Sequence, residues 1–246
     1  MKLINKLFKS KPTYKLSDIP ITVDMHSHLL PGLDDGVQDM DESLEMIRQM
    51  KALGYRKLIT TPHVMGDFYK NDPAIIQQSL EAVQEEVHNQ GIDVTIEAGG
   101  EYFIDEWFLD KIKHNNVMSF GDHFVLVETS FMNRPEQLLD TLFQVKVNGY
   151  KPIFAHPERY LYLYEDFEKF KEIYDKGVYF QINLNSLAGY YSPDAKYFAE
   201  QLIKHQMVDF VGSDAHRMNH LRVLETAMKS RSFPKLKELN LLNEKL

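Results

Sequence analysis

Short apolar segments alternate with amphipathic ones along most of this chain, and this alternation constrains the fold more than any other feature. The apolar segments have the length of strands, whereas the amphipathic ones repeat their apolar residues with the period of a helix. Such alternation is typical of βα units and a parallel sheet. We predict strands at 57–60, 93–98, 123–128, 152–155, 178–183 and 208–212, and helices at about 40–53, 73–89, 135–148, 165–176, 193–206 and 218–230.

Together with a strand that ends near His26, these segments make about seven strands, enough to close an α/β barrel. At 246 residues and 43% apolar composition, the chain can bury one large core and needs no second domain. We therefore predict a single barrel domain over residues 21–246. Residues 233–246 are predicted to form an amphipathic helix that seals the barrel or meets a second subunit, so a homo-oligomer is possible.

Charge is distributed unevenly. Residues 1–20 carry five lysines and one aspartate, although the whole chain has a formal net charge of -8. This segment is predicted to be a basic N-terminal arm, either frayed or in weak contact with a membrane surface or a partner. Net acidity argues against nucleic-acid binding. No secretory signal and no apolar stretch near the roughly 20 residues of a membrane span is visible, so we expect a cytoplasmic protein.

Histidines and carboxylates recur where the predicted strands end. His26 and His28 lie two residues apart, as do Asp214 and His216, so each pair projects from one face of an extended chain. A single histidine of this kind is more often an ordinary core or surface residue, but a set that keeps step with the βα repeat indicates a metal cluster. The predicted metal ligands are His26, His28, Asp35, His63, Glu101, Glu128, His156, Asp214 and His216.

The chain contains no cysteine, so any metal must bind to nitrogen and oxygen. Imidazole suits zinc, iron and manganese, whereas carboxylate favours harder ions; the mixed set therefore favours Mn²⁺ or Fe²⁺, with Zn²⁺ possible. About three divalent ions would outweigh the four carboxylates of the set and leave a positive pocket that matches a phosphate dianion. Arg159 could add a planar donor fork for phosphate oxygens, or it could be a surface loop residue. Asp24 could orient a ligand imidazole or be a simple buried acceptor.

These motifs resemble the PHP family, which is named for polymerase and histidinol phosphatase domains. The resemblance covers about residues 21–230. Within the family, the chain is most similar to the manganese-dependent protein tyrosine phosphatases encoded with bacterial capsule and exopolysaccharide genes. The motifs that carry it are His26-Ser27-His28, Asp34-Asp35-Gly36, Thr61-Pro62-His63, Gly100-Glu101, Glu128, His156-Pro157-Glu158-Arg159-Tyr160 and Ser213-Asp214-Ala215-His216. The resemblance implies a distorted (β/α)7 TIM-like barrel of the PHP type with three metals at its mouth.

The resemblance also implies a division of the ligands. One ion would be bound by His26, His28, Glu101 and Asp214, a second by Glu101, Glu128 and His156, and a third by Asp35, His63 and His216. Catalytic roles are assigned to Arg159, Arg222, His63 and His216. Arg222 lies six residues beyond His216, where the family pattern has five, and Arg217 follows the histidine directly; Arg222 is favoured.

The activity implied by the resemblance is hydrolysis of phosphotyrosine, with a tyrosine-phosphorylated bacterial kinase or its tail as the substrate and partner. Such a kinase would regulate capsular or exopolysaccharide synthesis. Two alternatives stay open. One is a PHP-type small-molecule phosphatase such as a histidinol-phosphate phosphatase, and the other is a non-catalytic, metal-bound regulator.

Overall fold

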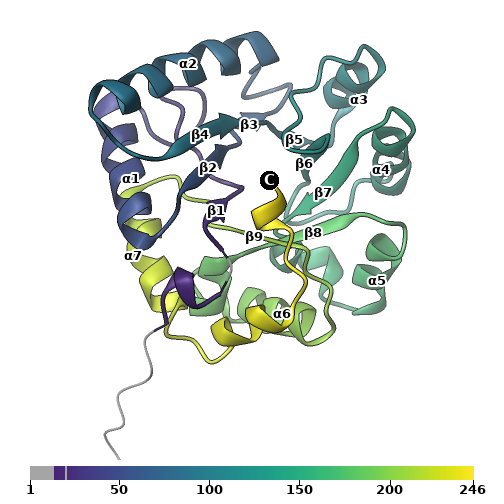
Figure 1. Ribbon diagram of the computed structural model, residues 1–246. Helices are drawn as coiled ribbons and strands as arrows, with labels where there is room; N and C mark the ends of the chain where they lie inside the picture. Colours follow the sequence, from purple (N-terminus) through teal and green to yellow (C-terminus); the bar gives the residue numbers. More distant parts are fainter. Residues whose placement is uncertain (1–13, 20) are drawn as a thin grey trace, which may run out of the picture.

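The computed structural model describes residues 14–19 and 21–246, and in it a ring of parallel strands is surrounded by helices (Figure 1). The strands are β1 (Val23–Asp24), β2 (Lys57–Thr60), β3 (His63–Val64), β4 (Thr95–Ala98), β5 (Glu101–Phe103), β6 (Phe124–Glu128), β7 (Lys151–Ala155), β8 (Tyr179–Asn183) and β9 (Phe210–Gly212). The α-helices are α1 (Met40–Leu53), α2 (Pro73–Asn89), α3 (Glu106–Lys113), α4 (Leu138–Val147), α5 (Glu168–Tyr174), α6 (Pro193–Lys204) and α7 (Met218–Ala227).

The nine strands occupy seven positions in the wall of the barrel. They form two sheets, ordered β1-β2-β4 and β3-β5-β6-β7-β8-β9. β3 continues β2 after a two-residue break, and β5 continues β4 in the same way. Backbone hydrogen bonds bridge the breaks, because Gly99 N donates to Thr60 O at 2.9 Å and Glu101 N donates to Pro62 O at 3.0 Å. The predicted α/β class with a distorted, seven-position parallel barrel is confirmed.

The wall closes where the ends of β1 and β9 meet. Asp214 N donates to His26 O at 2.8 Å, His28 N donates to Ala215 O at 3.0 Å, and Ser27 forms a parallel bridge with Ala215. Every strand pair in the two sheets is parallel, so all carboxyl ends lie on one side. Closure therefore occurs at the side where the predicted ligands follow their strands.

Local sequence signals account for most helix boundaries. Asp39 caps the start of α1 by accepting from Glu42 N, and Gly54 ends this helix with a φ of 115°. Asp72 caps α2, whose first residue is Pro73. All six predicted helices form, with ends that differ by three residues or fewer. The sequence reading missed the short helix α3, although its N-cap Asp105, which accepts from Phe108 N, was a visible signal.

The prediction of one helix over residues 233–246 was wrong. This segment forms two short 3-10 turns instead, Phe233–Glu238 and Asn243–Lys245. Tertiary contacts override helix propensity here, since Leu242 N donates to Asp209 O and the buried Asn243 bonds to two strands. The C-terminus lies inside the ring of strands, where Leu242 and Leu246 pack against the apolar residues of the barrel interior (Figure 1). The predicted sealing role is therefore confirmed, with a different local structure.

Packed structure begins before residue 21. Leu16 and Ile19 are buried in the main core, and the ring of Tyr14 contacts that of Phe233. Residues 1–13, with most of the predicted basic arm, lie outside the described residues. No helix of the described part of the chain is both long and apolar enough to cross a bilayer.

Replacement of Asn243 by alanine is expected to destabilise the protein by about 2–4 kcal/mol, because three buried hydrogen bonds are lost. The Asn243 amide donates to Val23 O at 3.0 Å and to Val211 O at 2.8 Å, and it accepts from Val211 N at 3.1 Å. It thereby links β1 to β9 at the end opposite their backbone closure. Urea unfolding would measure the change, with the exposed Lys245→Ala as the control. Equal stability of the two variants would contradict this role.

Candidate metal centre

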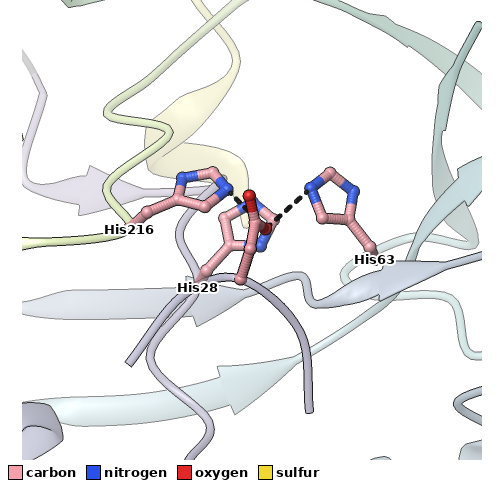
Figure 2. Close-up of side chains that lie close together, drawn as sticks. His28, His63 and His216 are labelled. Atoms are coloured by element: carbon pink, nitrogen blue, oxygen red, sulfur yellow. Dashed lines mark ion pairs between the residues drawn. The ribbon is translucent and has the colours of Figure 1, made fainter. Parts of the chain in front are cut away.

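All nine predicted ligands meet at the carboxyl ends of the strands. They come from every wall position except β8, and Asp35 comes from the loop before α1. Figure 2 shows the rings of His28, His63 and His216 facing a common point. The residues fall into four groups whose ligand atoms lie within 4.8 Å of one another: His28, Asp35, His63 and His216; His26, His28 and Asp214; His26, Glu101 and His156; and His63, Glu101 and Glu128.

Glu101 lies at the centre of the cluster and is fully buried. Its Oε2 is 3.1 Å from both His26 Nε2 and His63 Nδ1, and its Oε1 is 3.0 Å from His156 Nε2. This central position agrees with the predicted bridging role. Glu128, however, lies with His63, whose Nδ1 is 2.9 Å from Glu128 Oε1. The division of the ligands among individual ions therefore stays a prediction.

The donor set fits divalent cations. Glu101 Oε2 and His63 Nδ1 are buried, and neither has a hydrogen-bond partner among the described residues, although they lie 3.1 Å apart. Buried polar atoms are normally hydrogen-bonded. Glu101 Oε2 and His63 Nδ1 lie close together without forming a hydrogen bond to each other. This arrangement is the one expected of two ligands that bind the same cation. The nitrogen and oxygen donors of this cluster suit manganese, iron or zinc.

Electrostatics couple the carboxylates to the histidines. Burial lowers the pKa of His63, but the nearby Glu128 and Glu101 outweigh it and raise the value to about 9. Burial likewise opposes the charge of Glu101, yet His26 and His63 hold the pKa of this carboxyl well below its usual range. A cation must therefore compete with protons for these imidazoles.

Asp34 supports two ligands and was not predicted to do so. Its Oδ2 lies 2.6 Å from His28 Nδ1 and accepts from His63 N at 2.9 Å, while Oδ1 accepts from Gly36 N. Because the carboxylate only accepts, His28 carries its proton on Nδ1 and turns Nε2 toward the cluster. The position of Asp34 directly before the predicted ligand Asp35 was the signal in the sequence that could have indicated this supporting role.

Asp24 is a buried acceptor and does not orient an imidazole. It accepts from Ser213 N at 2.8 Å and from Ser213 Oγ at 3.0 Å, next to Asp214. Burial raises the pKa of Asp24 to about 7. Gln181 contacts His26 Nδ1 instead, at 2.9 Å. His220 is not among the predicted ligands, and its Nδ1 accepts from the backbone N of the predicted ligand His216 at 3.1 Å.

Arg159 lies beside the cluster and its side chain is 20% exposed. Nη1 donates to Asp214 Oδ2 at 2.8 Å. The guanidinium lies between two rings, 4.4 Å from the centre of Phe131 and 4.1 Å from that of Tyr191. These two cation–π contacts and the ion pair with Asp214 hold the side chain in this position.

The catalytic role of Arg222 stays a prediction. Arg222 is exposed on α7 and does not line the hollow beside the cluster. Arg217 does line this cavity of about 260 Å³, together with Asp35, Arg159 and His216. Of the two arginines considered from the sequence, Arg217 is therefore the one that lines this cavity.

Residues 22–229 match the family model described as "Capsular polysaccharide synthesis, CpsB/CapC". The chain belongs to the CpsB/CapC family. The tyrosine-protein phosphatase YwqE of Bacillus subtilis, a curated relative, is 30% identical over 80% of this chain and 78% of its own length. The tyrosine-protein phosphatase CpsB of Streptococcus agalactiae is 29% identical over 80% and 84%.

Solved structures agree with this membership. A structure from work on YwqE of Bacillus subtilis and CpsB of Streptococcus pneumoniae, described as unique metal-dependent tyrosine phosphatases, superimposes with a TM-score of 0.77. It is 29% identical to this chain and covers 88% of it and 91% of the solved chain. The CpsB/CapC relatives are thus metal-dependent tyrosine phosphatases, as the resemblance to the PHP family implied.

The Glu101→Gln variant is expected to lose bound metal while staying folded, since a neutral amide cannot bridge cations as a carboxylate does. Elemental analysis of the gel-filtered protein would give the ion count per chain, and circular dichroism would report the fold. Glu106→Gln, on the exposed start of α3, makes the same chemical change away from the cluster and should leave the count unaltered. An unchanged number of bound ions in Glu101→Gln would contradict the predicted role of Glu101 as a bridging metal ligand.

Proposed function

We propose that this chain is a metal-dependent protein tyrosine phosphatase that hydrolyses phosphotyrosine. The observation that carries the proposal is the convergence of nine nitrogen and oxygen ligands beside a stacked arginine at one end of a barrel. Membership of the CpsB/CapC family supports it, because the curated relatives are named as tyrosine-protein phosphatases.

The cluster would hold about three divalent ions, with Mn²⁺ preferred and Fe²⁺ or Zn²⁺ as alternatives. Such ions lower the pKa of bound water and stabilise the attacking and leaving oxygens of an in-line displacement at phosphorus. The protein arranges the donors before substrate arrives. Asp35, His63 and His216 form the open side, with side chains that are 60%, 16% and 14% exposed, whereas Glu101 and His26 form the buried side. A phosphoryl group would therefore enter past the first three residues.

Arg159 would bind the phosphoryl oxygens through its planar fork. In the described structure one arm of the fork is held by Asp214, so the remaining nitrogens can donate to a substrate while this ion pair keeps the side chain in place. Arg217 faces the same cavity and is positioned for a second contact, which we assign to it in place of Arg222. Two arginines stabilise the charge that develops on the phosphoryl group during transfer.

The surroundings of the cluster favour an aromatic phosphomonoester within a protein. Phe131, which stacks on Arg159, is 38% exposed, and its neighbour Met132 is 64% exposed. An exposed ring beside the phosphate-binding arginine offers a surface on which a substrate phenyl group can pack. Tyrosine also leaves readily as a phenolate, because its pKa is about 10. The site therefore needs no strong general acid.

A cytoplasmic, tyrosine-phosphorylated kinase or its tail is the substrate that we propose. The family description ties the chain to capsular polysaccharide synthesis, a process in which such a kinase would be the regulated partner. A phosphotyrosine in an extended tail could reach a site at the end of a barrel without unfolding of the kinase domain.

The direct test is turnover of three substrates by protein loaded with Mn²⁺. A phosphotyrosine peptide should have a higher kcat/KM than a matched phosphoserine peptide and histidinol phosphate, and chelation of the metal should abolish turnover. Fastest hydrolysis of histidinol phosphate would favour a small-molecule phosphatase. Metal binding without hydrolysis of any of the three substrates would indicate that the protein is a non-catalytic, metal-bound regulator.

The three arginines should differ in kinetic effect. Arg159→Ala is expected to lower kcat/KM for the phosphotyrosine peptide by roughly 10- to 100-fold, the value of one or two charged hydrogen bonds. Arg217→Ala should lower kcat/KM by a smaller factor, because we expect Arg217 to make a weaker contact with the phosphoryl group. Arg222→Ala is the matched control and should behave as the unmodified protein does. A larger loss for Arg222→Ala than for Arg217→Ala would restore the assignment made from the sequence.

A further inference from the structure

β8 is the one wall position that supplies none of the nine predicted ligands, yet it places two amide side chains beside them. Gln181 and Asn183 lie two residues apart on β8, so they project from the same face, and both are fully buried. Gln181 Nε2 donates to Asn183 Oδ1 at 2.8 Å. The other end of each amide contacts a predicted ligand, namely His26 for Gln181 and Asp214 for Asn183.

Chemistry sets the direction of these hydrogen bonds. The ionised Asp214 carboxylate can only accept, so Asn183 must present its NH₂ group to Oδ2, at 2.6 Å. Its carbonyl oxygen then faces Gln181, which must present its own NH₂ group in turn. This leaves Gln181 Oε1 as the acceptor, 2.9 Å from His26 Nδ1. His26 must therefore carry a proton on Nδ1, which leaves Nε2 as the nitrogen that can bind a cation in place of a proton.

The two ends of this series meet at the same place. His26 Nε2 lies 3.5 Å from Asp214 Oδ1, and both atoms belong to the group that also contains His28. Asp214 would thus offer Oδ1 to a cation. Its Oδ2 begins a series of hydrogen bonds through Asn183 and Gln181, and this series ends at His26 Nδ1 and leaves His26 Nε2 to bind the same cation.

The packing around the two amides leaves them little freedom. Asn183 N donates to the buried Glu158 Oε1 at 2.8 Å, which fixes the backbone of β8. On the neighbouring strand β9, a Cβ atom at Gly212 would lie 2.7 Å from His26 Cβ and 3.0 Å from Gln181 Nε2. Only glycine at this position allows His26 and Gln181 to approach as they do.

We propose that Gln181 and Asn183 are positioning residues that set the tautomer of His26 and the orientation of Asp214 for one cation. The inference rests on the proposed metal centre and deepens it. Neither residue touches the cation or substrate, and each acts through a ligand. Loss of a supporting partner of this kind typically lowers metal affinity by about 10- to 100-fold.

The test is calorimetric titration of metal-free protein with Zn²⁺, a diamagnetic probe that also permits NMR. Gln181→Leu removes the acceptor and should weaken the tightest binding step by about 10- to 100-fold. Gln181→Glu keeps an acceptor for His26 Nδ1 but loses the donor to Asn183 Oδ1, so it should recover part of this affinity. Gln78→Leu, an exposed position on α2, is the control. A Zn²⁺ affinity in Gln181→Leu equal to that of the unmodified protein would overturn the proposal.

A second readout requires no folded variant of Gln181. Ring ¹⁵N spectra of the Zn²⁺-loaded protein, with His26 assigned by comparison with His26→Asn, should show a proton on Nδ1. A proton on Nε2 would contradict the proposal directly. Failure of the metal centre itself would look different, because the unmodified chain would then bind no Zn²⁺ at all.

Discussion

The pairing of the ends of β1 and β9 is the interaction on which the rest of the structure depends. Two backbone hydrogen bonds, from Asp214 N to His26 O and from His28 N to Ala215 O, join the first strand to the last. They close the barrel and at the same time set His26 and His28 against Asp214. Because the same peptide groups do both, the fold cannot close without assembling this part of the cluster.

The cluster opposes the stability of the fold that carries it. Buried carboxylates such as Glu101 and Asp214 are costly without compensating charge, and three atoms of the cluster, Glu101 Oε2, His63 Nδ1 and His156 Nδ1, lack hydrogen-bond partners among the described residues. Two of the residues involved, His156 and Asp214, also have positive φ angles of 34° and 50°, a strained conformation for residues other than glycine. A bound cation would take over from the protonated imidazoles as the charge that compensates these carboxylates, so metal binding and folding are expected to be coupled. The apolar wall and the plug formed by Leu242 and Leu246 supply the opposing stability.

Local signals predicted the elements well where a single segment determines the outcome. Turn residues and periodicity located the start and end of α1 and α2 to within about one residue, and the bounds of β2 agree with the prediction. Prediction failed where distant contacts decide. The sequence did not indicate that β3 and β5 continue β2 and β4 after two-residue breaks, and the terminal segment is held by Asn243 instead of its own helical hydrogen bonds.

The sequence by itself determined the type of fold and which nine side chains would meet, because the βα repeat places every strand end on one side of a parallel barrel. It also excluded thiolate chemistry, since the chain has no cysteine. Only the tertiary structure decided which residues orient those ligands. Asp34, Gln181 and Asn183 are ordinary polar residues in the sequence, and their function depends on hydrogen-bond directions and distances of less than 3 Å. Such directions arise from packing between strands remote in the chain, and no local pattern records them.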